Sequence, residues 1–250
     1  MKKYIKVLSL SAILFSSFAL TPVSAETESL NENITEQQFK KVANYQLPPE
    51  LEAQAEQLAQ EIARETLQQE NELGISSNLV KKRNKIVSFS MQPSNSTPAN
   101  SIPGYNITAD FSNLMRSNRV RMESVRKQAA IIQQKNIDPI QGLAQSRAYT
   151  YSVFIKLVKT GGPWDYKVKY GLKNEYVFDN QKLTGEDLGN FHFGYVGKAI
   201  GFTDIELKGG AGFYQILSGT AEREYYKTYF DDPRDQKMIQ LGIDYYNKGY

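Results

Sequence analysis

The chain has 250 residues, with 30 Lys and Arg, 27 Asp and Glu, one His and no Cys, which gives a formal charge of +3. The lack of cysteine excludes a disulfide framework, a thiol nucleophile and an iron–sulfur cluster, and the single histidine excludes zinc sites built from several histidines. The hydrophobic share of 40% and the charged share of 23% are typical of globular proteins.

Residues 1–25 have the pattern of a secretory signal peptide. Three lysines precede an apolar stretch, and the small-x-small sequence Val23-Ser24-Ala25 follows it. The apolar stretch is too short for a stable membrane span, although an N-terminal anchor is the alternative interpretation. We therefore expect cleavage after Ala25, a secreted mature chain and no membrane anchor after cleavage. Without the three leader lysines, the mature chain has 27 basic and 27 acidic side chains, a formal charge of zero.

Residues 26–74 form an acidic segment, in which eleven Glu face three basic residues for a net charge of −8. Pro49 suits the first turn of a helix, and Gly74 suits a C-cap. A narrow apolar stripe at helical spacing lies between them and consists of Leu51, Ala55, Leu58 and Ile62. The pattern predicts one acidic helix over 49–73, which serves as a pro-segment, a docking arm or a solvated spacer.

The composition of residues 75–104 predicts a flexible linker. They contain four basic residues and no acid, and they end in a tract rich in Ser, Pro, Asn and Gly that cannot build a core. The basic cluster is a processing site, an anion contact or a solvated charge run. Residues 75–147 together have a net charge of +8, which mirrors the acidic segment, so that segment can mask the basic one.

Residues 105–250 are of the size of a single domain and predict an α+β fold. Helical spacing marks residues 112–135. The period then changes, and alternation in residues 149–158 favours a strand, with a helix as the alternative. A turn at 160–163 precedes two β-leaning runs in 164–178.

Two further helices are expected near the end of the chain. Thr203-Asp204 can cap a helix over 205–217. The best-marked helix begins at Pro233, with Asp232 as N-cap and Asp235 three positions further on, in a pair like a capping box. This capping role explains both acidic residues without any chemistry.

Familiar catalytic and nucleotide motifs are absent, including GxSxG, the P-loop, GxGxxG and the EF-hand loop. Instead, polar, glycine and aromatic residues gather in three stretches. These are residues 159–167 around GGPWDYK, residues 189–197 with the sequence GNFHFGYVG, and residues 231–235 with the sequence DDPRD.

Two of these stretches contain candidate catalytic side chains. On an extended chain, Asp165 and Lys167 point to the same face, where they form a structural ion pair or supply a base and a charge stabiliser. His192 is the one side chain here that titrates near neutrality, and on an extended chain it faces away from Phe191 and Phe193. A satisfied polar residue is the simpler interpretation of that histidine.

The order and spacing of the three stretches, with the closing helix, resemble the C-terminal domain family polymorphic toxin type 44, also called bacterial toxin 44, over residues 110–250. Members of this family lie at the C-termini of bacterial conflict toxins and are themselves regarded as predicted toxins with ribonuclease activity. The family often has Asn where this chain has His192. The resemblance therefore favours Asn190, Asp165 and Lys167 over His192 as catalytic residues.

Carried over by position, the resemblance implies a catalytic set and a substrate-binding set. The catalytic set is Asp165, Lys167, Asn190 and His192. The substrate-binding set is Trp164, Gly189, Phe191, Gly194, Tyr195, Asp232 and Asp235. No metal site and no cofactor are expected.

These observations predict a secreted toxin whose domain over 105–250 cleaves RNA without a metal, and whose partner is a cognate immunity protein. Asp165 or His192 would remove the 2′-hydroxyl proton, Lys167 would stabilise the phosphorane, and Asn190 would orient the phosphate. Two alternatives stay open. One is a toxin that attacks peptidoglycan or its lipid-linked precursor, and the other is a secreted binding protein without catalysis.

Overall fold

A computed structural model describes residues 45–75, 105–208 and 233–250, which all belong to one compact unit that begins at Gln37. The expected signal peptide, its cleavage site, the linker residues 76–104 and Asp232 lie outside the described residues. Within the described residues, no helix combines the length and the apolar character needed to cross a bilayer.

Seven helices and three short strands make up the described parts of the chain. The helices are α3 (Pro49–Leu73), α5 (Thr108–Gln134), α6 (Pro139–Val158), α7 (Tyr166–Tyr170), α8 (Gly185–Ile200), α9 (Asp204–Lys208) and α11 (Pro233–Asn247). The strands are β1 (Tyr105–Asn106), β2 (Glu175–Phe178) and β3 (Gln181–Thr184). This mixture confirms the expected α+β class.

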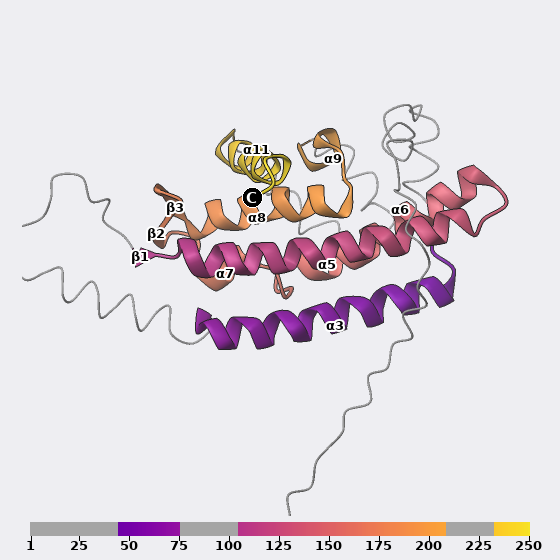
Figure 1. The fold of residues 1–250 in the computed structure, drawn as a ribbon, viewed down its shortest axis with the longest axis horizontal. Coiled ribbons are helices and arrows are strands. Elements are labelled where there is room, and N and C mark those ends of the chain that lie inside the picture. The colour runs from indigo at the N-terminus through magenta and orange to yellow at the C-terminus, as the bar shows by residue number, and fades with distance from the viewer. Residues whose placement is uncertain (1–44, 76–104, 209–232) are drawn as a thin grey trace, which may run out of the picture. The chain divides into compact units, whose positions relative to one another are not determined.

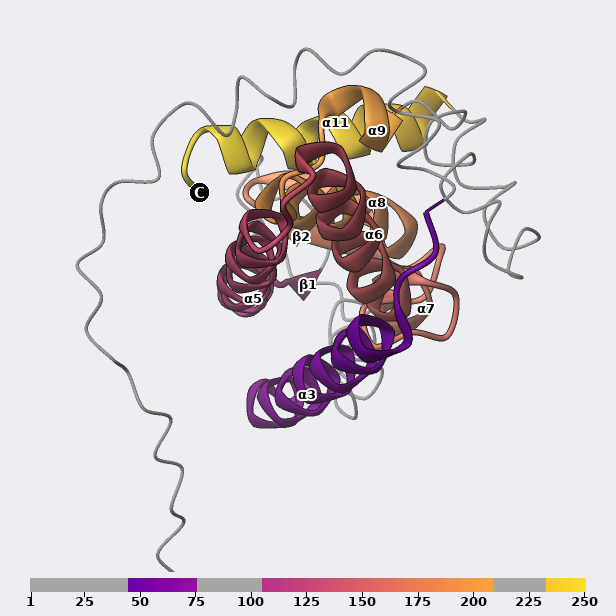
Figure 2. The same cartoon turned by 90° about the vertical axis from the view of Figure 1, so that its right-hand side faces the viewer.

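The helices pack in layers around α8, as Figures 1 and 2 show. α11 and α9 lie on one side of α8, whereas α5, α6 and α7 lie on the other. α3 lies beyond α5 and α6 and packs mainly on α6. Nearly every residue of α8 is buried, because helices cover it on both sides.

The acidic helix has the predicted bounds, since α3 begins at Pro49 and ends before Gly74, whose left-handed φ of 66° closes it. Ala55 and Ile62 of its stripe are buried against the core, as is the neighbouring Ala59. The helix therefore packs on the domain, while its role as a pro-segment or a docking arm stays a prediction.

Helix α5 confirms the predicted helical spacing over 112–135, but the strand predicted over 149–158 is wrong. Those residues form the second half of α6, which begins after Asp138, whose side chain accepts hydrogen bonds from the amides of Ile140 and Gln141. Tyr151, Val153, Phe154, Ile155 and Leu157 are all buried. A helix buried on most faces has no polar face to reveal its period, so alternation among its residues is misleading.

The extended structure predicted for the first β-leaning run is also wrong, because YKVKY forms the one-and-a-half-turn helix α7. The second run is right, since EYVF is strand β2. β2 pairs antiparallel with β3 and parallel with β1. Asp179 and Asn180, with φ values of 47° and 60°, form the two-residue turn of the hairpin, where a positive φ at both positions suits the strand twist.

The two C-terminal predictions are confirmed as far as the structure describes them. α9 begins as expected after Thr203, whose hydroxyl accepts a hydrogen bond from the amide of Glu206. The rest of the span to 217 lies outside the described residues. α11 begins at Pro233 as predicted and buries Met238, Gly242 and Tyr245 on one face.

Candidate functional site

Side chains from the three polar stretches meet between α7, α8 and α11. Lys167 Nζ lies 3.8 Å from Asp235 Oδ2, and Asn190 Nδ2 donates a hydrogen bond of 2.6 Å to Asp235 Oδ1. All three residues are buried. We call this group the Lys167–Asn190–Asp235 cluster. Sequence spacing alone does not show that stretches 45 residues apart share one site.

Burial and the nearby carboxylates have opposite effects on the pKa of Lys167. Burial lowers the pKa of Lys167, because an ammonium loses hydration there, while Asp235, Glu186 and Asp165 act in the opposite direction. Asn190 Oδ1 is buried and has no hydrogen-bond partner among the described residues. Buried polar atoms without a partner are rare and costly in folded proteins, so this oxygen marks a place where a further donor would be stabilised.

Glycines bring the three helices close enough to form the cluster. A Cβ at Gly189 would lie 2.3 Å from Lys167 Cγ, so only glycine lets α7 rest against α8 there. A Cβ at Gly194 would lie 2.1 Å from the Ile239 carbonyl oxygen, and one at Gly242 would lie 2.0 Å from the Phe191 carbonyl oxygen. The glycines therefore set the crossing of α8 and α11.

Asp165 is not on an extended chain with Lys167, contrary to the sequence interpretation. It is the N-cap of α7, where its carboxylate accepts hydrogen bonds from the amides of Val168 and Gly161 at 3.4 and 2.9 Å. This arrangement fixes the turn before α7. Lys167 lies two residues later, in the first turn of α7, and extends to Asp235 of α11 instead.

His192 lies inside an aromatic cage, and not on the face away from aromatic rings that an extended chain would give. Its ring meets Trp164 and Tyr166 edge-on, with centroids 5.4 and 4.6 Å away. Its Nε2 lies 3.1 Å from Asn118 Nδ2. Burial, with a smaller contribution from Lys169, lowers the pKa of His192 to about 3, so the imidazole is neutral near pH 7.

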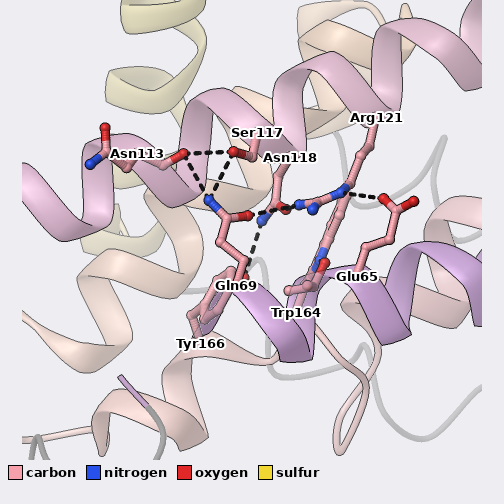
Figure 3. Close-up of polar contacts among 9 residues, drawn as sticks. Glu65, Gln69, Asn113, Ser117, Asn118, Arg121, Trp164 and Tyr166 are labelled. Carbon is pink, nitrogen blue, oxygen red and sulfur yellow. Dashed lines mark hydrogen bonds and ion pairs between the residues drawn. The ribbon is translucent and has the colours of Figure 1, made fainter. Parts of the chain in front are cut away.

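Polar contacts connect this cage to helix α3 (Figure 3). Asn118 Nδ2 donates to the Tyr166 hydroxyl at 3.1 Å, and Arg121 Nη1 donates to Asn118 Oδ1 at 2.8 Å. Arg121 also donates to Glu65 and Gln69 of α3, at 3.1 Å each. Sequence analysis did not identify Asn118 or Arg121, because neither lies in a polar stretch.

The cavity beside Lys167 is small. It has a volume of about 10 Å³, and its lining includes Trp164, Asp165, Gly189 and His192. A cavity of this size holds at most one water molecule. A nucleotide therefore needs the covering side chains to move before it reaches Lys167.

The residues of the predicted substrate-binding set lie mostly in packing contacts. Trp164 is buried, and its indole nitrogen donates to Thr66 of α3 at 3.0 Å. Phe191 meets Phe178 and Tyr245 edge-on, and the Tyr195 hydroxyl donates to the Tyr250 carbonyl at 2.6 Å. Of that set, the structure brings Asp235 into the cluster and places Gly189 against Lys167.

A second buried ion cluster was missed by sequence reasoning. Glu206 accepts hydrogen bonds from Arg147, from the Tyr151 hydroxyl at 2.5 Å and from the Thr203 amide at 2.6 Å. We call it the Arg147–Tyr151–Glu206 cluster. The Thr-x-x-Glu spacing of residues 203–206 is the sequence signal that could have pointed to its acidic member.

Acidic and histidine side chains do not gather elsewhere in a metal-binding group. No set of three or more that could hold an ion occurs within residues 45–75, 105–208 and 233–250. Lys167, Asn190 and Asp235 themselves supply an ammonium, an amide and a carboxylate group.

Comparison with known proteins gives one match. Residues 153–248 match the family described as bacterial toxin 44, a span that contains all three helices of the cluster but begins later than the resemblance over 110–250 suggested. No curated protein and no solved structure matches the chain. Over residues 153–248, the chain carries a bacterial toxin 44 domain.

Proposed function

We propose that this toxin domain cleaves RNA and that the Lys167–Asn190–Asp235 cluster supplies its reacting groups. The observation that carries the proposal is the meeting of three polar side chains from three separate stretches, with a long ion pair of 3.8 Å and an unpaired Asn190 oxygen. A buried amide oxygen without a hydrogen-bond partner among the described residues can accept a hydrogen bond from a substrate.

Each residue has a role in the proposed reaction. The Asp235 carboxylate takes the proton of a ribose 2′-hydroxyl, and the 2′-oxygen then forms a bond to the adjacent phosphorus. The Lys167 ammonium stabilises the phosphorane and protonates the 5′-oxygen as the phosphorus–oxygen bond breaks. The products are a 2′,3′-cyclic phosphate and a free 5′-hydroxyl. Proton transfer from Asp235 to Lys167 restores both groups.

Asp235 is a better base for this reaction than the two candidates named from the sequence. The Asp165 carboxylate already accepts two amide hydrogen bonds that hold the turn before α7. His192 has a pKa of about 3 and lies within an aromatic cage, so it is a weak base. Asn190 orients the Asp235 carboxylate through its 2.6 Å hydrogen bond.

The test uses the full chain incubated with total RNA, with and without a chelator. We expect cleavage in both, and a loss of at least about 100-fold in Lys167→Gln and Asp235→Asn. The control is Lys182→Gln, because Lys182 is an exposed lysine paired with an exposed acid on the β2–β3 hairpin. RNA that stays intact with the unmodified chain would contradict the proposal.

We also propose that the toxin is exported through residues 1–25 and neutralised in the producing cell by an immunity protein. N-terminal sequencing of secreted protein should begin at Glu26. The same leader favours an envelope target as the second candidate. Toxicity that requires the leader, together with degradation of purified peptidoglycan or its lipid-linked precursor, would support that candidate instead.

A further inference from the structure

We propose that Arg121, Lys156 and Lys169 form a binding surface for a single RNA strand, and that helix α3 occupies this surface in the structure. We call these three residues the cationic track. The strand is taken to be RNA because the proposed function is RNA cleavage, and to that extent the inference rests on the proposed function. It adds where the strand binds and what prevents it from binding.

Acidic side chains of α3 pair with every member of the cationic track. Lys156 Nζ lies 2.7 Å from Glu52 and 3.5 Å from Glu56. Arg121 donates to Glu65 at 3.1 Å. Lys169 Nζ contacts both carboxylate oxygens of Glu70 at 2.7 Å. The track therefore already binds a helix that presents negative charges to it at four positions.

The spacing of these pairs suits a nucleic-acid strand. At a rise of 1.5 Å per residue, Glu52 and Glu70 are about 27 Å apart along α3. The three cations come from α6, α5 and α7, so separate elements build one extended row. A row of this length accommodates several nucleotides, in the range of single-strand binding sites.

Aromatic side chains lie beside the cations at the end of the row. Lys169 Nζ is 5.3 Å from the centroid of the Tyr166 ring. Trp164 lies under α3 and uses its indole nitrogen to bind Thr66. Cations interleaved with aromatic rings are the usual means of binding single strands, because the rings stack on bases of any sequence. Both rings are buried while α3 is in place, so they can stack on bases only after α3 is displaced. The row of cations itself favours a polyanionic strand such as RNA as the occupant.

The contacts between α3 and the cationic track are of a kind that an RNA strand can replace. The fully buried residues of α3 are Ala55, Ala59, Ile62, Thr66 and Glu70, and Leu51, Leu58 and Leu73 pack partly buried against the core. Apolar contacts and ion pairs therefore both attach α3, and the ion pairs are the part that a polyanion can replace. Partly exposed ion pairs weaken as salt rises and yield to a competing polyanion.

The first experiment measures binding without cleavage. A fluorescent 2′-O-methyl oligoribonucleotide has no 2′-hydroxyl to attack, and anisotropy gives its dissociation constant with the full chain. We expect Glu52→Gln/Glu56→Gln/Glu65→Gln to bind about tenfold more tightly than the unmodified chain. The affinity should fall with salt at a logarithmic slope of about −2, for three contacts on a single strand.

A matched variant controls for the change in net charge. Glu50→Gln/Glu61→Gln/Glu72→Gln removes the same charge from exposed positions of α3, outside the pairs with the track. We expect it to bind like the unmodified chain. An equal gain in both triple variants would overturn the proposal. Addition of Lys156→Gln to the first variant should abolish its gain, whereas addition of Lys182→Gln should not.

The second experiment holds α3 in place. Gln69 Nε2 and Ser117 Oγ are 2.8 Å apart, and the chain has no cysteine, so Gln69→Cys/Ser117→Cys introduces the only two thiols. A cleavable bis-maleimide that joins them should block oligonucleotide binding, and its reduction should restore binding. Unchanged binding in the joined form would overturn the inference.

Cleavage is measured separately, so the two proposals fail in different ways. Binding that follows α3 without any RNA cleavage would overturn the proposed function and leave the binding surface. Cleavage that is indifferent to the α3 variants would overturn the surface and leave the active cluster.

Discussion

Two buried clusters in this domain combine a cation, a carboxylate and a neutral polar group, yet their contacts differ. In the Arg147–Tyr151–Glu206 cluster, the carboxylate accepts three hydrogen bonds, and Arg147 also donates to the Gly201 carbonyl at 3.2 Å. In the Lys167–Asn190–Asp235 cluster, the ion pair is 3.8 Å long, and the Asn190 oxygen has no hydrogen-bond partner among the described residues. The carboxylate of the first cluster is fully bonded, whereas the second cluster keeps one buried oxygen that can still accept a hydrogen bond.

In this fold, the group that stabilises the core and the groups proposed to react lie in separate clusters. Burial alone would raise the pKa of Glu206, but the Arg147 charge and the bonds from Tyr151 and Thr203 lower it, so the group stays charged and fixed. Burial lowers the pKa of Lys167, so that group is easier to deprotonate than an exposed lysine. Four predictions test this contrast.

The largest effect on stability should follow from the complete cluster. Arg147→Met leaves Glu206 buried without its cation, and we expect the free energy of unfolding in urea to fall by about 3–5 kcal/mol. The double variant Arg147→Met/Glu206→Leu should recover most of that loss. Lys182→Met, which breaks an exposed pair, should change the free energy by less than about 1 kcal/mol. Equal losses in the two single variants would remove the contrast.

The incomplete cluster should show the reverse pattern. We expect Asp235→Asn to slow RNA cleavage by about 10²–10⁴-fold while it destabilises the fold by less than half as much as Arg147→Met. Asparagine keeps an oxygen for the Asn190 amide, and Lys167 can release its proton. Urea unfolding and initial cleavage rates on the same preparations check this split. A large loss of stability with unchanged cleavage would show that the cluster is structural.

A smaller effect is expected where α8 crosses α11. Gly194→Ala places a methyl group against the Ile239 backbone, so we expect a loss of about 1–3 kcal/mol and weaker cleavage, because Asn190 and Asp235 move apart. The matched control is Gly197→Ala, whose methyl group meets the movable end of Leu207 instead. The control should lose less stability and keep its cleavage rate. Equal effects would mean that the crossing does not align the cluster.

The last effect is spread over a range of pH. His192 has a pKa of about 3 when folded and 6.5 as its ordinary value, so the unfolded chain binds its proton first as the pH falls. The free energy of unfolding should therefore decrease between pH 6.5 and 3, by up to about 1.4 kcal/mol per pH unit from this residue. His192→Asn should flatten that decrease in urea titrations. Parallel curves for the two proteins would contradict the assigned burial.

The elements with marked ends were predictable from the sequence, and those buried on several sides were not. Pro49 and Gly74 gave α3 its bounds, and Pro233 gave α11 its start, because these residues act locally. α6 and α8 are buried on most faces and lack a polar face. The order of their side chains therefore does not reveal a helical period, and residues 149–158 and 189–197 were interpreted as extended. The Asp138-Pro139 pair was a local signal for α6 that was overlooked.

The site was predictable in its residue types but not in its grouping. Lys167, Asn190 and Asp235 were all singled out, although Asp235 was first explained as a cap. Their meeting depends on how α7, α8 and α11 cross, and that crossing is set by backbone contact at Gly194 and Gly242. Contacts of this kind involve pairs of residues far apart in sequence, which composition and periodicity do not record.

The position of Asp235 in the chain has a consequence for biosynthesis. Lys167 and Asn190 are made well before Asp235, which belongs to α11, the last of the described helices. While translation is in progress, a nascent chain held on its ribosome contains two of the three members of the cluster. The proposed nuclease is therefore incomplete until Asp235 has been added and α11 has packed on α8, so the order of these elements delays its activity during synthesis.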